Sequence, residues 1–274
     1  MNGTITPSTQ YLDVTGGRLA YDDTRQGDGT PVVLLPGMLD TRRAYRHLHP
    51  LLTAAGHRVI TMDLRGFGET SIVWDDYSPA AIAADVLALL DHLGIERAVL
   101  VGQSYTGATV VKLAGDAPQR VAGIALIDSF VEHRSNALMR GVMAVMGTAM
   151  VHWPATWGFY LRKMAFPGPR PADLDTYVDG LVADLRTPGR KTATRGHVTG
   201  DSAPIGWCAA VRCPSLVLMG AKDPDFPDPA AVADRQAAAL GARKVMIEGS
   251  GHYPMADNPQ ATADALLPFL AELA

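Results

Sequence analysis

The 274-residue chain has only two cysteines, Cys208 and Cys213, which lie five positions apart. This spacing differs from the paired Cys-x-x-Cys of zinc sites, and no nearby histidine completes such a site. The eight histidines contain no His-Glu-x-x-His sequence either, so neither a metal nor another cofactor is indicated. We therefore expect two reduced thiols, as is usual in a cytoplasmic protein, and no disulfide.

Long apolar runs and a strong excess of one charge are also missing. No uninterrupted run of about 18 apolar residues occurs, so we expect no membrane-spanning helix. The first residues show no basic segment followed by an apolar one, so we expect no secretory signal and a cytoplasmic location. The formal net charge of −4 argues against a nucleic-acid partner and leaves a small-molecule substrate as the expected one.

The chain does have a globular composition, with 47% hydrophobic and 19% charged residues. A predicted hairpin comes first, and strand-like and helix-like segments then alternate along the chain. The predicted strands are 11–14, 18–21, 32–35, 58–62, 97–101, 123–128, 215–219 and 244–247, and helices are expected over 48–56, 78–94, 108–114, 229–240 and from Asn258-Pro259 onward. This alternation predicts an α/β fold with a mostly parallel sheet flanked by helices, and with ligands at the strand carboxyl ends.

One segment, about 130–208, interrupts the alternation because it contains no clear strand and is rich in methionine and aromatic residues. We expect it to form a helical cap inserted into a core made of residues 1–129 and 209–274. Methionine and tryptophan give an adaptable apolar wall, so some of them should contact substrate while the others pack the cap onto the core. The candidates are Met143, Met146, Met150, Trp153 and Trp157.

A candidate nucleophile lies between a predicted strand and a predicted helix, in the sequence Gly102-Gln103-Ser104-Tyr105-Thr106-Gly107. A tight turn at this junction exposes the Ser104 hydroxyl, and the helix N-terminus stabilises an oxyanion formed there. The usual pattern is Gly-x-Ser-x-Gly. Here Thr106 stands at the second glycine position, and Gly107 comes one residue later.

A candidate acid and a candidate base each follow a later predicted strand. Asp223 follows strand 215–219, and His252 follows strand 244–247 on a loop with glycines and a proline that we expect to be mobile and reachable by solvent. Two other acids are alternatives to Asp223. Asp225 lies two residues further on, and Asp128 ends the strand 123–128.

The order Ser, Asp, His resembles that of the α/β-hydrolase-fold serine hydrolases of the esterase type with a helical cap. Residues 32–38 resemble the strand and oxyanion loop of this family, and residues 63–70 resemble its Asp-x-Arg-Gly-x-Gly turn. Pro36 stands where the family usually has a histidine that braces the loop. Because the oxyanion donor is a backbone N–H, Pro36 does not remove it from Met38.

The resemblance implies a catalytic triad in which Ser104 is the nucleophile, His252 the general base and Asp223 the residue that orients the histidine. The backbone N–H groups of Met38 and Tyr105 would form the oxyanion hole. Serine at the elbow favours acyl transfer to water over epoxide opening or halide displacement, for which the family uses aspartate there. We predict a hydrolase of carboxylic esters, or lactones, of small to medium apolar substrates through an acyl-serine intermediate.

Two alternatives share the same triad and stay open. One is a hydrolase-fold ligand sensor or regulator with slow or no turnover. The other is a non-hydrolytic enzyme, such as a lyase or a cofactor-free perhydrolase.

Overall fold

The computed structural model describes residues 8–131, 145, 147–199 and 205–273. Its strands are β1 (Gln10–Val14), β2 (Gly17–Asp23), β3 (Val32–Leu35), β4 (Val59–Met62), β5 (Ala98–Gln103), β6 (Val121–Ile127), β7 (Ser215–Gly220) and β8 (Arg243–Ile247). They form one sheet in the order β1-β2-β4-β3-β5-β6-β7-β8. β2 is antiparallel to both β1 and β4, and every other neighbouring pair is parallel. The mostly parallel sheet is therefore confirmed.

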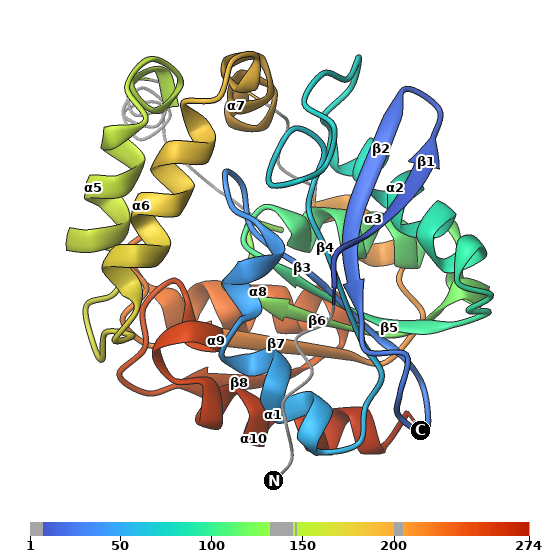
Figure 1. Ribbon diagram of the computed structural model, residues 1–274. Helices are drawn as coiled ribbons and strands as arrows, with labels where there is room; N and C mark the ends of the chain where they lie inside the picture. The colour runs from blue at the N-terminus through green and yellow to red at the C-terminus, as the bar shows by residue number, and fades with distance from the viewer. Residues whose placement is uncertain (1–7, 132–144, 146, 200–204, 274) are drawn as a thin grey trace, which may run out of the picture.

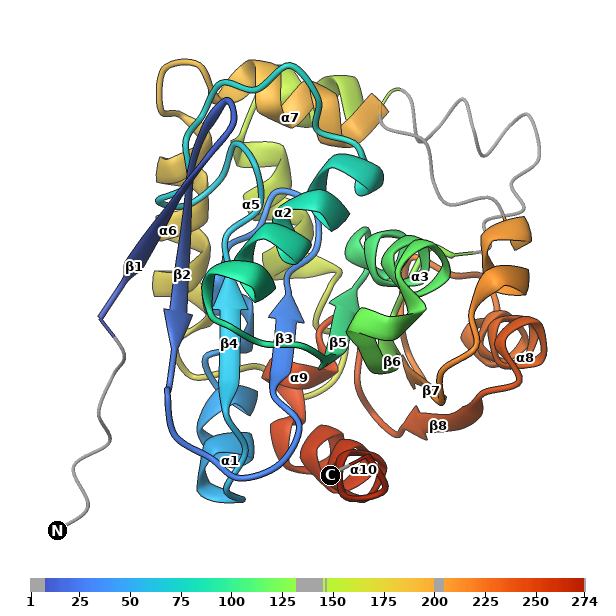
Figure 2. The same ribbon diagram turned by 90° about the vertical axis from the view of Figure 1, so that its right-hand side faces the viewer.

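Helices cover both faces of this sheet. Their bounds are α1 (Leu48–Ala54), α2 (Pro79–His92), α3 (Thr106–Asp116), α8 (Pro229–Leu240), α9 (Pro254–Asp257) and α10 (Pro259–Ala271), with 3-10 turns η1 (Arg42–Tyr45) and η2 (Pro118–Arg120). α1 packs against α10 on one face, and α2 packs against α3 on the other (Figures 1 and 2). The α/β fold class predicted from the alternation is confirmed.

Burial explains why the central strands are apolar along their whole length. Every residue of β3, β4, β5, β6 and β7 is buried, as expected for parallel strands with helices on both faces. The edge strand β1 instead alternates between half-buried and exposed residues. Helix α2 begins where expected, since the Ser78 side chain accepts a hydrogen bond from the Ala81 N–H. Asn258 does precede α10, but its side chain makes no capping hydrogen bond.

The described part of the segment between β6 and β7 contains helices and no assigned strand. Residues 147–152 are helical, and they are followed by α5 (Ala155–Lys163), α6 (Leu174–Leu185), α7 (Arg190–Thr199) and the 3-10 turn η3 (Ile205–Ala210). Figure 2 shows β3 and β4 pointing toward the side of the molecule where α5, α6 and α7 lie. The division into a core of 1–129 and 209–274 and a cap of 130–208 stays a prediction, because residues 132–144, 146 and 200–204 lie outside the described residues.

Both cysteines are free, as expected. Cys208 is buried and Cys213 is half-buried. Burial raises the pKa of the Cys213 thiol, which keeps that thiol protonated at neutral pH. Among the described residues, no helix is both long enough and apolar enough to cross a membrane.

Candidate active site

Ser104 lies in the turn between β5 and α3 with a left-handed backbone, φ 53°. Such a conformation is uncommon for a residue other than glycine and is a form of local strain that clusters at functional sites. The surrounding structure fixes it, since the Ser104 N–H donates to the Ile127 carbonyl at 2.8 Å and its own carbonyl accepts from the Gly107 N–H at 3.1 Å. The sequence therefore forms the expected strand–turn–helix elbow around Ser104.

The unusual Thr106-Gly107 pair has a structural explanation. The Thr106 hydroxyl is buried and lies 2.9 Å from the Leu35 carbonyl and 3.0 Å from the Gln103 carbonyl, so it links the ends of β3 and β5. A Cβ atom at Gly107 would lie 2.1 Å from the Ser129 hydroxyl, so any side chain there would have to displace the buried Ser129. The small residue that the elbow needs is thus at position 107.

A hydrogen-bond chain joins the three candidate residues. His252 Nε2 lies 2.9 Å from Ser104 Oγ, and His252 Nδ1 lies 2.7 Å from Asp223 Oδ2. The three residues follow β5, β7 and β8, so the parallel sheet brings their loops to one edge. This arrangement allows His252 to remove the Ser104 proton while Asp223 holds the imidazole in the required tautomer.

The histidine loop differs from expectation, because His252 is buried and not exposed to solvent. His252 is only 2% exposed to solvent. Its N–H donates to the Ala165 carbonyl at 3.0 Å, and its carbonyl accepts from the Gln103 side-chain amide at 3.0 Å. A Cβ atom at Gly251 would lie 2.3 Å from the Ala165 carbonyl oxygen. The expectation that solvent reaches this histidine was therefore wrong, since the chain around Ala165 packs directly on the loop.

Two buried carboxyl groups lie side by side behind the histidine. Asp128 Oδ1 accepts a hydrogen bond from the Gly220 N–H at 2.8 Å, and the Asp128 side chain is hydrogen-bonded to that of Asp223. Burial and the neighbouring Asp223 charge raise the pKa of Asp128 well above its usual value. Asp128 therefore keeps its proton at neutral pH and donates it to Asp223, which is the acid nearest to His252.

Among the described residues, one group of side chains is close enough together to hold a metal ion. It consists of Asp128, Asp223 and His252, and one atom of each lies within 4.8 Å of the others. The hydrogen bonds from Asp128 to Asp223 and between Asp223 and His252 account for this closeness without an ion.

A third carboxylate, Asp225, faces the other ring nitrogen. Asp225 Oδ2 lies 3.5 Å from His252 Nε2, and its Oδ1 accepts a hydrogen bond from the Tyr160 hydroxyl of α5 at 2.8 Å. Burial lowers the pKa of His252, but the charges of Asp223 and Asp225 outweigh burial and raise it to about 9. The site therefore stabilises the imidazolium form that His252 adopts when it takes a proton.

The candidate oxyanion loop packs directly on the elbow. It follows β3, and a Cβ atom at Gly37 would lie 3.1 Å from Ser104 Cβ and 2.2 Å from Gln103 Oε1. Met38 is the next residue, and Leu39 has a left-handed backbone with φ 57°. Tyr105, the second expected donor, lies at the start of α3 directly after Ser104. Both expected donors thus belong to segments that adjoin Ser104.

The buried carboxyl group of Asp40 braces this loop. Asp40 is fully buried, and its Oδ1 accepts hydrogen bonds from the Thr41 N–H at 2.6 Å and from the Tyr177 hydroxyl of α6. The Tyr253 hydroxyl, next to His252, is also bonded to Asp40. Burial raises the pKa of Asp40 to about 6, against the effect of these hydrogen bonds. One carboxyl group therefore ties the loop after β3 to α6 and to the histidine loop.

The upstream Asp-x-Arg-Gly-x-Gly turn has a structural role. Asp63 is fully buried and forms an ion pair with Arg42. A Cβ atom at Gly68 would lie 2.2 Å from Asp63 Oδ2, and the Gly68 φ is +56°. The Thr70 hydroxyl donates to the Asp63 carbonyl at 3.0 Å and accepts from the Ala20 N–H at 2.8 Å. This turn therefore holds the end of β4 beside β2.

Helix α7 is fixed to the core next to the elbow. A Cβ atom at Gly196 would lie 2.6 Å from the Tyr77 ring. The His197 ring stacks on the Tyr105 ring with centroids 4.9 Å apart. Burial lowers the pKa of His197 to about 3, so this imidazole is neutral. The sequence indicated no such contact, because it depends on how α7 packs on the core.

The predicted substrate-contacting residues have different environments. Met150 and Trp157 are buried, whereas Trp153 is 65% exposed. Met143 and Met146 lie outside the described residues. Contact of any of these side chains with substrate stays a prediction.

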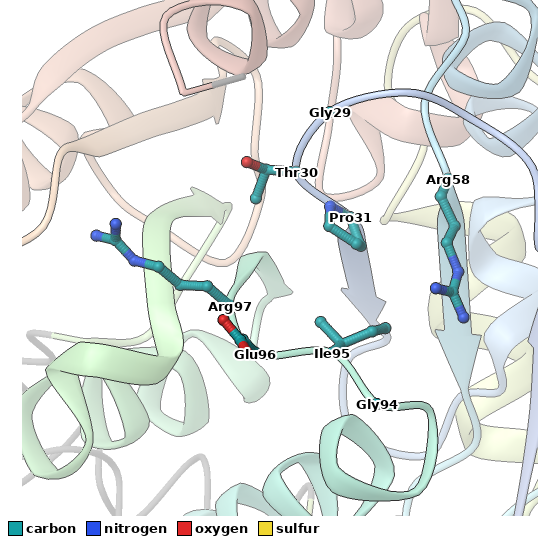
Figure 3. Close-up of a pocket in the computed structure, with 8 residues that line it drawn as sticks. All are labelled: Gly29, Thr30, Pro31, Arg58, Gly94, Ile95, Glu96 and Arg97. Carbon is teal, nitrogen blue, oxygen red and sulfur yellow. The ribbon is translucent and has the colours of Figure 1, made fainter.

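A shallow pocket of about 390 Å³ lies far along the sheet from Ser104. It is lined by residues that precede β3, β4 and β5, including Pro31, Arg58 and Arg97 (Figure 3). Ser104 follows β5, so this pocket is at the opposite end of the same strands. The apolar cavity expected above Ser104 stays a prediction.

Comparison with known proteins identifies relatives. Residues 30–179 match the family model of the alpha/beta hydrolase fold. The chain is 25% identical over 329 aligned residues to epoxide hydrolase A of Mycobacterium tuberculosis, covering 97% of this chain and 98% of that protein. A shorter match, 41% identical over 123 residues, is to the dihydrolipoyllysine-residue acetyltransferase component of the acetoin cleaving system of Pseudomonas putida. It covers 45% of this chain and 33% of that protein.

Among solved structures, a bromoperoxidase from Bacillus anthracis superimposes with a TM-score of 0.84. The two chains are 22% identical, and the match covers 96% of this chain and 100% of the other. At this level of identity, the likeness concerns the fold alone.

Proposed function

Because this chain belongs to the alpha/beta hydrolase fold family, we propose that it is a serine hydrolase that cleaves carboxylic esters, or lactones, of small to medium apolar substrates. The observation that carries the proposal is the continuous hydrogen-bond chain from Asp223 through His252 to Ser104. A serine hydroxyl is a weak nucleophile at neutral pH and needs a base within hydrogen-bond distance, which His252 supplies.

The proposed reaction has two acyl-transfer steps. Ser104 Oγ attacks the ester carbonyl while His252 Nε2 takes its proton, and Asp223 stabilises the imidazolium. The oxyanion lies against the N–H groups of Met38 and Tyr105, and each such donor contributes on the order of 3 kcal/mol in the transition state. His252 then gives its proton to the departing alcohol, and water releases the acyl group by the reverse sequence.

The residue at the elbow supports ester cleavage over other reactions of the family. One full-length relative is named an epoxide hydrolase, a reaction for which members of the family use aspartate at the elbow. This chain has serine there, with a base at 2.9 Å. Serine with a histidine base suits acyl transfer, whose acyl-enzyme water can hydrolyse.

A panel of p-nitrophenyl esters of increasing acyl length tests the proposal. We expect turnover by the wild-type protein, an optimum at small to medium chain length, and loss of turnover in Ser104→Ala with unchanged thermal unfolding. Tight binding of esters without turnover would instead indicate a ligand sensor. Turnover that requires peroxide, or elimination without water uptake, would indicate a perhydrolase or a lyase.

A further inference from the structure

Helix α6 is attached to the core at both of its ends. At the first end, Asp173 precedes the helix and pairs with Arg46, whose Nε and Nη2 atoms lie 2.6 and 2.9 Å from its carboxylate oxygens. At the other end, Asp184 accepts the Gly68 N–H at 3.3 Å and pairs with Arg190 at 2.8 Å. The two attachments can be disturbed separately, because they lie roughly 16 Å apart along the helix.

The first attachment includes the segment that follows Met38, the proposed oxyanion donor. Tyr177, in the first turn of α6, donates its hydroxyl proton to Asp40 Oδ1, and Asp40 comes two residues after Met38. The Arg46 guanidinium covers the Tyr177 ring at 3.9 Å from its centroid. Asp40 is fully buried and Tyr177 is 9% exposed. This end of α6 therefore bonds to the proposed oxyanion loop itself.

The residue between Met38 and Asp40 has a strained backbone. Leu39 is buried and left-handed, with φ 57°, a conformation that L side chains rarely adopt. Such strain persists only where the surrounding structure holds it. On the carboxyl side of Leu39, the Asp40 carboxyl accepts the Thr41 N–H at 2.6 Å as well as the Tyr177 hydroxyl. Asp40 is therefore the buried anchor that follows the strained residue.

We propose that Asp40 is a positioning residue for the oxyanion hole, and that its hydrogen bond with Tyr177 makes the direction of the Met38 N–H depend on α6. This inference rests on the proposed ester hydrolysis. An oxyanion donor acts on the charge that develops in the transition state, so a misdirected donor slows the reaction without weakening ground-state binding of the ester. Losing the Asp40–Tyr177 bond should therefore lower kcat and leave KM nearly unchanged.

Variants at the two ends of α6 separate this role from a general loosening of the helix. Tyr177→Phe keeps the ring under Arg46 but loses the hydroxyl, and we expect kcat to fall about tenfold with KM within about twofold of wild type. Asp40→Ala should lower kcat about 100-fold, and Asp40→Asn should lower it less, because the amide oxygen can still accept both hydrogen bonds. Asp184→Asn is the matched control at the other end, and its kcat and KM should stay within about twofold of wild type.

Titration with an alkyl trifluoromethyl ketone measures the oxyanion hole without turnover. Ser104 Oγ bonds to the ketone carbon, His252 takes the Oγ proton, and the π electrons of the carbonyl move to its oxygen, which becomes the oxyanion of a hemiketal. We expect the Kd of this ketone to rise in Tyr177→Phe and Asp40→Ala by about the factor by which kcat falls. The Asp184→Asn control should bind it as the wild type does. If Asp40→Ala does not fold, Tyr177→Phe carries the test, since it removes only a hydroxyl group.

The outcomes separate this inference from the proposed function. Wild-type kcat and ketone affinity in Tyr177→Phe, a higher KM at unchanged kcat, or an equal loss of kcat in Asp184→Asn each overturn the positioning role and leave ester hydrolysis standing. If the wild type turns over no ester, the proposed function fails, and the ketone titration decides the inference. Weaker ketone binding in Tyr177→Phe but not in Asp184→Asn then supports it. Equal binding by wild type and Tyr177→Phe, or no hemiketal on wild-type Ser104, overturns it.

Discussion

Substituting the two paired carboxyl groups one at a time should lower kcat by very different amounts. Asp223 Oδ2 lies 2.7 Å from His252 Nδ1, whereas Asp128 contacts Asp223 and the Gly220 N–H. Burial raises the pKa of Asp223, but the attraction of His252 and the hydrogen bonds from His252 and Asp128 lower it below its usual value. Asp223 is therefore the ionised member of the pair, and Asp128 is the protonated one.

The size of each effect follows from these contacts. In Asp223→Asn an amide can face Nδ1 with its NH₂ group and favour the wrong histidine tautomer, which lowers kcat on the order of 10⁴-fold, or about 5.5 kcal/mol. In Asp128→Asn the amide oxygen can still accept from Gly220 N–H, and the NH₂ group can replace the acid proton that Asp128 donates. We therefore expect a loss of less than about tenfold, or about 1.4 kcal/mol.

The contributions of Asp128 and Asp223 to the free energy of unfolding should change with pH in opposite directions. The unfolded chain loses the Asp128 proton above the usual pKa of 3.8, whereas the folded protein keeps it. The folded state then binds one more proton, so this group makes wild-type stability fall as pH rises above that value. Asparagine has no proton to lose, so the Tm of Asp128→Asn relative to wild type should increase with pH. Asp223, with a lowered pKa, contributes stability above its usual value that Asp223→Asn loses.

Steady-state kinetics on one p-nitrophenyl ester and thermal unfolding between about pH 4 and 8 measure both effects. A larger loss of kcat in Asp128→Asn than in Asp223→Asn would refute the reasoning and make Asp128 the triad acid.

Three further results are expected. The kcat/KM of the wild type should rise with pH, with an apparent pKa well above 6.5. The reason is that only neutral His252 acts as a base and its pKa is raised to about 9. A pH–rate profile with a midpoint at or below 6.5 would contradict this. Gly37→Ala should lower kcat by about tenfold or more, because its Cβ atom would lie 2.2 Å from the Gln103 side chain that holds the histidine loop. Unchanged steady-state kinetics would argue against this. Thr106→Val should lower the Tm by about 2–6 °C. The variant loses the buried hydroxyl that donates to the Leu35 carbonyl, which should lower the free energy of unfolding by about 1–1.5 kcal/mol. An unchanged calorimetric Tm would contradict this role.

The sequence predicted the sheet well because buried parallel strands are continuous apolar runs that end at turn residues. β3 and α8 have the predicted bounds, and the starts of β4 and β8 differ from the prediction by one residue. The nearness of Ser104, Asp223 and His252 follows from the same pattern, since each follows a parallel strand and the carboxyl ends of such strands share an edge.

Features that depend on contacts between distant segments were not predictable. Glycine and proline around His252 indicated a mobile loop, but the chain at Ala165 covers it. The Asp40–Tyr177 contact joins residues 137 positions apart and has no local pattern. Asp128 and Asp225 were recognised only as alternatives to Asp223. Their positions on either side of the Asp223–His252 pair come from backbone turns, including the left-handed Asp128 with φ 46°.

The most direct test of the account is whether an ester acylates Ser104. In rapid-mixing experiments with a p-nitrophenyl ester, the reaction is quenched with acid, and peptide mass spectrometry then locates the acyl group. We expect one acyl group per wild-type chain on the peptide that contains Ser104, formed together with released p-nitrophenol, and no acyl group in Ser104→Ala. An acyl group on another residue, or turnover of the ester by Ser104→Ala at a rate close to that of the wild type, would contradict the central claim.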